Sequence, residues 1–367
     1  MVPPISVMIK PASGHCNLKC EYCFYRDIMK KRETPCYGQM SEEVLQCVIK
    51  KLLAHAEKSC SFAFQGGEPT LVGMAFYEKV LAIQQKYNKN NVRIYNSLQT
   101  NGYSLDEQWA SFFKRNQFLV GVSLDGGPKI QDLYRKNSTG EGSFYQVMKN
   151  IELLKKMGVV FNILSVVTGK SASLIKKTYH FFRKNQLYYL QFIPCLDPLE
   201  EEPGNREYSL RPEEFGTFLI TLFDLWYIDF CRGQQPYIRQ FENYLSILRG
   251  RCPEACDMGG NCSIQYVIEA DGSVYPCDFY VGDQYRLGNL LKDSIEDIDA
   301  ERKNKLFIEQ SMQKSSECQE CRYYKLCRGG CRRTRLDWEG HRQYYCKAYK
   351  NFFDARLPQL LKVARIL

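Results

Sequence analysis

The chain lacks the long sequence runs that tie a protein to a membrane or to a nucleic acid. None of its 367 residues lies in a stretch of about 18 consecutive apolar residues, the length that a spanning helix needs. Its start, MVPPISVMIK, lacks the charged, apolar and small-residue zones of a secretion signal. The net charge is +9, but lysine and arginine are scattered without a run of about five or six. We therefore expect a cytoplasmic protein with no membrane and no nucleic-acid partner.

Histidine is also scarce, with four residues, whereas cysteine is abundant, with 17. An odd number of cysteines in a chain of this length without a secretion signal makes disulfides a poor explanation and metal ligation a better one. The length predicts about two domains of ~150 residues each.

The segment CNLKCEYC, residues 16–23, holds three cysteines as C-x3-C-x2-C. They are Cys16, Cys20 and Cys23. An iron–sulfur cube normally takes four cysteines, so three would leave one iron open to a ligand that is not protein. His15 is too near Cys16 to complete the set easily, and Cys36 is remote. The alternatives are a partial zinc site and buried structural thiols.

Residues 5 to about 195 alternate between β-rich runs and helical stretches, which predicts a parallel sheet with right-handed crossovers. Strands are expected at 5–10, 61–65, 92–98, 118–124, 159–167 and 187–193, and helices at 41–58, 73–88, 105–116, 143–157 and 171–185. Two further helices, 211–232 and 236–249, are rich in aromatic residues that we assign to the core. Six strands are too few for a closed eight-stranded barrel, so we predict an open, partial (β/α)6 barrel with ligands at the carboxyl ends of its strands.

Three successive strands end in turn-forming residues, namely FQGGEP at 64–69, TNG at 100–102 and SLDG at 123–126. Each alone is an ordinary turn signal. Together, downstream of the cysteine motif, they predict a ligand site, and paired glycines would allow a close approach to the backbone.

Nine of the cysteines stand from Cys252 onward. Two sets of four ligands can be drawn from Cys256, Cys262, Cys277, Cys318, Cys321, Cys327, Cys331 and Cys346. Between the two groups, IQYVIEADGSVYPCDFY predicts a hairpin that turns at Asp271-Gly272. Zinc could also close such sites, as in a zinc ribbon. Asp278 follows Cys277 directly and is either a turn residue or a carboxylate placed beside a cluster.

The C-x3-C-x2-C motif followed by GGEP resembles the radical S-adenosylmethionine enzymes. The resemblance implies that the cofactor's amino and carboxylate groups bind the open iron, and that Tyr22 contacts the adenine. It places Gly66, Gly67, Glu68 and Pro69 at the amino group and Ser123 and Arg135 at the ribose and the methionine carboxylate. An arginine fork suits a carboxylate.

The C-terminal cysteine pattern resembles the SPASM extension of peptide-modifying radical enzymes, which carries auxiliary four-iron clusters. The resemblance implies one cluster on Cys256, Cys262, Cys277 and Cys331 and another on Cys318, Cys321, Cys327 and Cys346, with Cys252 a rival to Cys256. Together with the cluster expected on Cys16, Cys20 and Cys23, the resemblance implies three 4Fe–4S clusters. We predict a radical S-adenosylmethionine barrel at 1–235 and a SPASM domain at 236–367.

Over its whole length the chain most resembles the anaerobic sulfatase-maturating enzymes. This implies that a 5′-deoxyadenosyl radical abstracts hydrogen from a peptidyl cysteine or serine, with Asp278 as the base, and that the product is Cα-formylglycine. Tyr25 and Gln65 are expected to line the substrate pocket. The implied partners are a sulfatase peptide with Cys/Ser-x-Pro-x-Arg and an external low-potential electron donor. The alternatives are another SPASM peptide maturase, such as a thioether former, and a non-catalytic zinc or nucleic-acid module.

Overall fold

The computed structural model describes residues 4–366, which form two compact units that interleave along the sequence. Of the described residues, unit 1 contains 4–123 together with Tyr134–Phe161 and Ile264–Phe307. Unit 2 contains Leu124–Leu133, Asn162–Ser263 and residues 308–366. The sequence predicts two domains that follow one another along the chain, with a boundary between residues 235 and 236. That boundary stays a prediction.

Unit 1 is built on parallel strands that pair in the order β8-β1-β2-β3-β4. These strands are β1 (Ile5–Ile9), β2 (Ser59–Phe64), β3 (Arg93–Thr100), β4 (Leu119–Ser123) and β8 (Tyr266–Ile268), and two short antiparallel strands, β9 (Ser273–Tyr275) and β10 (Gly288–Asn289), follow β8. The register sets Ile9 opposite Phe64 on one side and Ile268 on the other. The next residue of each strand therefore lies at the same carboxyl edge of the sheet.

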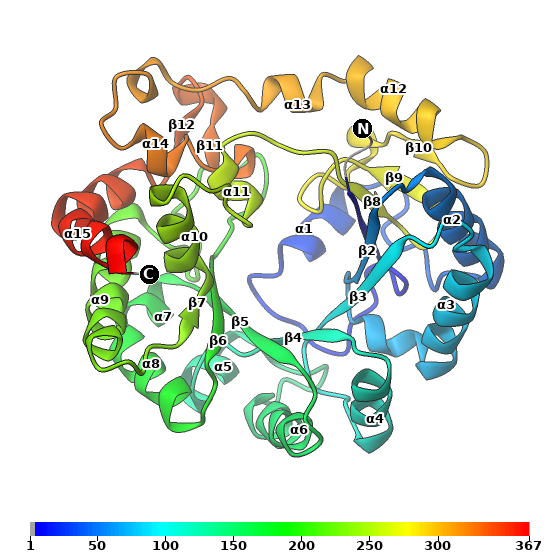
Figure 1. The fold of residues 1–367 in the computed structure, drawn as a ribbon, viewed down its shortest axis with the longest axis horizontal. Helices are drawn as coiled ribbons and strands as arrows, with labels where there is room; N and C mark the ends of the chain where they lie inside the picture. Colours follow the sequence, from blue (N-terminus) through cyan, green and yellow to red (C-terminus); the bar gives the residue numbers. More distant parts are fainter. Residues whose placement is uncertain (1–3, 367) are drawn as a thin grey trace. The chain divides into compact units, whose positions relative to one another are not determined.

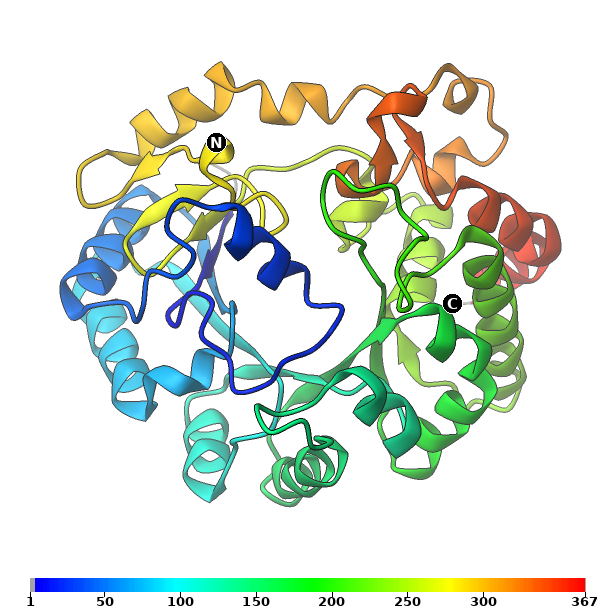
Figure 2. The ribbon, with the colours of Figure 1, turned by 180° about the vertical axis from the view of Figure 1, so that it is seen from behind.

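Helices follow the strands of unit 1 in sequence and cover them. They are α1 (Phe24–Lys31), α2 (Glu42–His55), α3 (Met74–Tyr87), α4 (Glu107–Arg115), α6 (Phe144–Lys156) and α12 (Ile295–Asn304), with turns of 3-10 helix at η1 (Pro69–Val72) and η2 (Asp283–Tyr285). Ser41 caps α2 by accepting a hydrogen bond from the backbone N–H of Val44, at 3.2 Å. Figures 1 and 2 both show α2 and α3 side by side along the outside of β2 and β3.

Unit 2 contains parallel strands, a helical layer and the cysteine-rich C-terminal part. Its strands are β5 (Phe161–Val167), β6 (Tyr189–Pro194) and β7 (Tyr237–Ile238), with a two-stranded ribbon of β11 (Arg335–Leu336) and β12 (Arg342–Gln343). Its helices are α7 (Gly169–Ser173), α8 (Ile175–Lys184), α9 (Pro212–Cys231), α10 (Arg239–Leu248), α11 (Cys256–Gly259), α14 (Tyr324–Cys327) and α15 (Cys346–Ile366), with 3-10 turns η3 (Ser316–Cys318), η4 (Arg332–Thr334) and η5 (Asp337–Glu339). Two short helices, α5 (Pro128–Tyr134) and α13 (Phe307–Gln310), lie where the chain passes from one unit to the other.

The aromatic residues of α9 form the core of unit 2, as predicted. Phe223 and Trp226 are fully buried, and the ring of Phe223 lies 5.8 Å from that of Phe352 on α15. Figure 1 shows α9 and α15 packed side by side. Trp226 also donates a hydrogen bond from its indole N–H to the carbonyl of Pro236, at 3.0 Å.

The predicted α/β fold with a parallel sheet is confirmed, as is the hairpin turned at Asp271-Gly272. The predicted helix 171–185 is instead two helices, which are divided at Leu174, whose φ of −106° and ψ of 12° are not helical. A capping box of Thr168 and Ser171 starts the first of them, α7, before the predicted start. The predicted helix 236–249 begins only at Arg239, because Tyr237 and Ile238 form the short strand β7. The sequence analysis did not predict α1 or α5. No helix within residues 4–366 is both long and apolar enough to span a membrane.

Candidate active site

The carboxyl edge of the unit 1 sheet carries the residue that the sequence analysis proposed as the base. Asp278 is buried, with 7% of its surface exposed. The ammonium of Lys10, the residue after β1, forms an ion pair with Asp278 Oδ1. Gln65, the residue after β2, donates a hydrogen bond from Nε2 to Asp278 Oδ2 at 3.0 Å. Both oxygens of the carboxylate are therefore held by residues that the strand register places at one level.

A second buried network lies beside Asp278. The hydroxyl of Tyr25 donates to Glu269, the residue after β8, and Arg32 Nη1 forms an ion pair with the same carboxylate at 2.7 Å. Lys10 Nζ lies 4.1 Å from the centre of the Tyr25 ring, a cation–π contact. Burial, followed by the negative charge of Glu269, raises the pKa of Tyr25 well above its usual value. Tyr25 therefore keeps its proton and can fix neighbours in place, but it does not act as a base.

Two polar side chains contact the cysteines of the loop 16–23. Asn101, after β3, lies with Nδ2 3.7 Å from Cys16 Sγ. Arg135 is 7% exposed, and its Nη1 lies 3.8 Å from Cys20 Sγ. The guanidinium also lies 5.4 Å from the ring centre of Tyr22. Arg135 thus joins the cysteine loop to the aromatic residue predicted to contact the adenine.

The GGEP segment packs backbone to backbone against the cysteine loop. Gly67 donates from its N–H to the Ser13 carbonyl at 2.8 Å, and a Cβ on Gly67 would lie 2.0 Å from the carbonyl oxygen of His15. A Cβ on Gly66, whose φ is +142°, would lie 2.9 Å from the Ser13 carbonyl oxygen. These glycines therefore permit a close approach of the chain to itself, and the ligand contact expected of them stays a prediction.

Glu68 is fully buried and joins GGEP to the end of β3. Its carboxylate accepts hydrogen bonds from Thr70 N at 3.1 Å, Thr70 Oγ1 at 2.7 Å, Thr100 Oγ1 at 2.8 Å and Asn101 N at 2.7 Å. Burial raises the pKa of this carboxyl, although the hydrogen bonds, led by that from Asn101, oppose the rise. The side chain therefore organises the loop, and a contact between this segment and the cofactor's amino group stays a prediction.

Pro69 and Ser123 complete the predicted cofactor residues in unit 1. Pro69 is buried and starts the 3-10 turn η1, and its carbonyl accepts a hydrogen bond from Tyr77 at 2.8 Å. Ser123 ends β4, and its Oγ accepts a hydrogen bond from Gln99 Nε2 at 3.2 Å. Their cofactor contacts also stay predictions.

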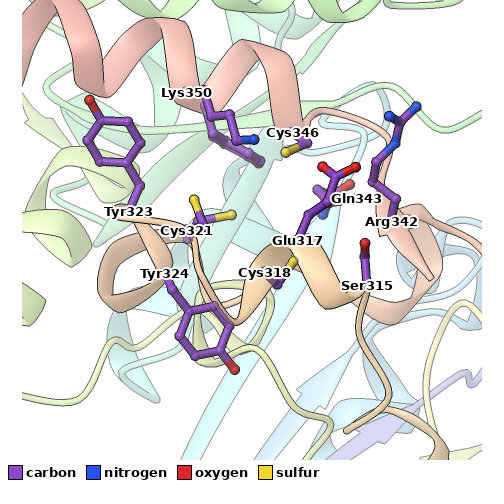
Figure 3. Close-up of a pocket in the computed structure, with 13 residues that line it drawn as sticks. Ser315, Glu317, Cys318, Cys321, Tyr323, Tyr324, Arg342, Gln343, Cys346 and Lys350 are labelled. Atoms are coloured by element: carbon purple, nitrogen blue, oxygen red, sulfur yellow. The ribbon is translucent and has the colours of Figure 1, made fainter. Parts of the chain in front are cut away.

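Four C-terminal cysteines line one pocket in unit 2, as the predicted pairing requires. They are Cys318, Cys321, Cys327 and Cys346. Figure 3 shows three of these thiols with Lys350, which comes from the first turns of α15 beside Cys346. The charge of Lys350 opposes the rise that burial causes in the pKa of Cys346.

Three cysteines of the other predicted set also meet within unit 2. The charges of Cys256 and Cys262 act on the thiol of Cys331, which favours Cys256 over Cys252 as a ligand. Cys277 belongs to unit 1, so its place as the fourth ligand stays a prediction.

The donor chemistry of these three groups fits iron–sulfur clusters, which are held by cysteine thiolates. Among residues 4–366, no three His, Cys, Asp or Glu side chains are arranged to hold a single metal ion. The sequence analysis did not single out Lys10, Arg32 or Glu269. Lys10 and Glu269 each directly follow a strand, β1 and β8, so a search of every strand end for polar residues could have found them.

Comparison with known proteins identifies the family of the chain. Residues 11–182 match the family model of the radical SAM superfamily, and residues 256–322 match SPASM, an iron–sulfur cluster-binding domain. The chain is 48% identical over 99% of both chains to the cysteine-type anaerobic sulfatase-maturating enzyme of Clostridium perfringens, and 33% identical, over 97% of this chain and 90% of the relative, to the serine-type enzyme of Bacteroides thetaiotaomicron. A solved structure described as native anSMEcpe with bound AdoMet and Cp18Cys peptide matches with a TM-score of 0.94 and 48% identity, covering 99% of each chain.

Fold, site and comparisons define a radical S-adenosylmethionine enzyme with an additional iron–sulfur domain. More narrowly, the chain belongs to the family of anaerobic sulfatase-maturating enzymes. Its cofactors are accordingly S-adenosylmethionine and iron–sulfur clusters, and its substrate is a peptide.

Proposed function

We propose that this chain oxidises a cysteine of a sulfatase to Cα-formylglycine. The observation that carries the proposal is the buried Asp278 carboxylate, held on both oxygens by Lys10 and Gln65 at the carboxyl edge of the sheet. Ligands bind at this edge in open parallel α/β folds. The relative of known type with 48% identity supports the same reaction.

The reaction removes one hydrogen atom, one proton and one electron from the substrate side chain. When bound, S-adenosylmethionine would supply the radical chemistry that removes the hydrogen atom from Cβ, and auxiliary clusters held by the C-terminal cysteines would accept the electron. Asp278 takes the thiol proton as a general base, and Lys10 and Gln65 hold its carboxylate for that transfer. The resulting thioaldehyde reacts with water, which releases sulfide and leaves the aldehyde.

We assign eleven cysteines to three 4Fe–4S clusters, three of them in the loop 16–23 and eight in the C-terminal sets. Arg135 supports the first assignment because its guanidinium lies against both Cys20 and Tyr22, in the loop that would hold the cluster. A planar guanidinium can pair with both oxygens of the methionine carboxylate. An external low-potential donor supplies the electron that starts each turnover.

We propose cysteine over serine as the preferred target residue. The cysteine-type relatives are 48% and 44% identical to this chain, whereas the serine-type relatives are 33% and 31% identical. The recognised segment is Cys-x-Pro-x-Arg in an unfolded or nascent sulfatase.

The test is anaerobic incubation of the iron-loaded enzyme with S-adenosylmethionine, a reductant and two peptides that differ only in Cys or Ser at the target position. We expect the cysteine peptide to lose its sulfur and two hydrogen atoms and to gain one oxygen, faster than the serine peptide loses two hydrogen atoms. A cross-linked product that keeps its sulfur would instead identify a thioether-forming maturase.

The variant Asp278→Asn tests the role of the carboxylate. We expect it to cleave S-adenosylmethionine but to form aldehyde at least 100-fold more slowly, on the order of the 10²–10⁴-fold contribution of a general base. Unchanged aldehyde formation would remove Asp278 from the reaction.

A further inference from the structure

Arg335, the first residue of β11, occupies a buried position among the cysteine-bearing loops of unit 2. Its side chain is 7% exposed. A guanidinium has five N–H donors, and here the side chain makes five hydrogen bonds to backbone carbonyls. The acceptors are Gly329 O at 2.9 Å, Ser311 O at 2.5 Å, Gln313 O at 3.0 Å, Gly260 O at 2.5 Å and Gly330 O at 2.7 Å.

The five carbonyls come from the segments that carry both sets of cysteines. Gly260 lies between Cys256 and Cys262, in the first set. Ser311 and Gln313 precede Cys318, in the second set. Gly329 and Gly330 stand between Cys327 and Cys331, where the chain passes from one set to the other. One side chain therefore ties together the loops of both sets.

The local backbone is shaped to present these carbonyls. Gly260, Gly329 and Gly330 have φ values of +79°, +79° and +63°, in the region that favours glycine. A Cβ on Gly330 would lie 1.9 Å from Gln343 Nε2, and one on Gly260 would lie 2.4 Å from the carbonyl oxygen of Arg328. These glycines thus keep the loops close enough to share one guanidinium.

A buried guanidinium stays charged, and its desolvation is costly unless hydrogen bonds offset it. The charge of Arg335 also acts on a neighbouring group. The pKa of the Lys314 ammonium is lowered, first by the burial of Lys314 and then by the positive charge of Arg335. A four-iron cluster with four thiolates carries net negative charge, which grows when it accepts an electron. Net charge and hydrogen bonding are among the features that set its reduction potential.

We propose that Arg335 is a positioning residue shared by the two auxiliary clusters, which fixes their cysteine loops and whose positive charge favours their reduced state. This inference rests on the proposed auxiliary clusters. In the reaction, Arg335 would help those clusters accept the electron that leaves the substrate once its hydrogen atom and proton are gone.

The experiment compares Arg335→Met, which removes the charge, with Arg335→Lys, which keeps the charge but loses the fork. Arg365→Met, an exposed position near the end of α15, is the control. The readouts are iron per chain, the midpoint potentials of the cluster signals in an anaerobic spectroscopic titration, and the ratio of aldehyde formed to S-adenosylmethionine cleaved.

For Arg335→Met we expect at least a tenfold fall in the equilibrium constant for reduction of an auxiliary cluster, about 59 mV for one electron. Arg335→Lys should keep the potential closer to that of the wild type, and the control should change nothing. Iron loss confined to the auxiliary sites, with S-adenosylmethionine cleavage retained, would also support the proposal.

Full iron content with unchanged potentials and an unchanged product ratio in Arg335→Met would overturn the inference. So would collapse of the whole chain in both Arg335 variants, which would indicate a general structural role. The proposed function fails differently, if the wild-type protein itself binds about four iron atoms per chain in place of about twelve.

Discussion

The ammonium of Lys10 and the carboxylate of Asp278 form a buried ion pair between residues 268 positions apart in the chain. Removing one partner of such a pair leaves a buried charge unpaired, which costs about 3–5 kcal/mol. We therefore predict that Lys10→Met lowers the free energy of unfolding by about this amount and slows aldehyde formation. Denaturant unfolding and a peptide assay by mass spectrometry would measure the two effects.

A double variant separates these effects. Lys10→Met/Asp278→Asn should recover part of the lost stability, because no unpaired charge remains, but should not recover aldehyde formation. Lys51→Met is the matched control, since the Lys51 ammonium also bonds within unit 1, to the carbonyls of Leu290 and Asp293. It should leave turnover unchanged. Stability losses that simply add in the double variant would show that Lys10 and Asp278 are not coupled.

The contact between GGEP and the cysteine loop predicts the effect of one methyl group. A Cβ on Gly67 would lie 2.0 Å from the His15 carbonyl oxygen, which belongs to backbone and cannot swing aside. Gly67→Ala should therefore displace the loop that holds Cys16, and we expect the loss of one cluster's iron and of S-adenosylmethionine cleavage. Iron analysis and an assay for 5′-deoxyadenosine would measure this.

Gly233→Ala is the control for backbone conformation alone. Gly233 has a φ of +68° and no atom within 4 Å of an added Cβ. Gly233→Ala should lower the free energy of unfolding by about 1–2 kcal/mol, the cost of a left-handed conformation for alanine, without changing the iron content. Equal iron loss in the two variants would contradict a role for the Gly67–His15 contact.

Much of the fold could be predicted because its signals are local. The six predicted strands, which correspond to β1 to β6, and the helices that follow them are marked by hydrophobic periodicity and by caps such as Ser41. The helix α1 was missed because it is only eight residues long and directly follows the last cysteine of the loop 16–23, so its apolar residues fill little more than two turns.

The site was only partly predictable because its partners meet through strand register. The spacing of the cysteines and the letters of GGEP predict cluster ligands and a cofactor loop, and Asp278 and Gln65 were also predicted as site residues. The pairing of Lys10 with Asp278, and of Glu269 with Tyr25 and Arg32, depends on β1 lying between β2 and β8. No local pattern in the sequence encodes that neighbourhood.

The carboxylate of Glu68 predicts a pH-dependent difference between wild type and Glu68→Gln. An amide can keep the bonds to Thr70 and Thr100 but then turns its NH2 group toward the N–H of Asn101, which costs about 1–3 kcal/mol. Asn101 contacts Cys16, so S-adenosylmethionine cleavage should also fall. The control Glu78→Gln, at an exposed position on α3, should change neither the stability nor the cleavage of S-adenosylmethionine.

The sign of the pH dependence follows from the raised pKa of Glu68. A carboxyl with a folded-state pKa above its unfolded value stabilises the fold most below the unfolded pKa, and this contribution is lost as the pH rises through the folded value. The stability advantage of wild type over Glu68→Gln should therefore shrink as the pH rises through that range. An advantage that grows with pH in denaturant titrations would contradict the raised pKa.

The choice between Cys256 and Cys252 as a cluster ligand can be decided by two matched substitutions. Cys256 and Cys262 act on Cys331, which places Cys256 beside two other predicted ligands. Cys252 lies four residues earlier, ahead of α11, and both cysteines are exposed, so burial does not separate them. We predict that Cys256→Ala loses about four iron atoms per chain, one cluster, and uncouples S-adenosylmethionine cleavage from aldehyde formation, whereas Cys252→Ala keeps its iron and its activity. Iron loss in Cys252→Ala alone would exchange the two assignments.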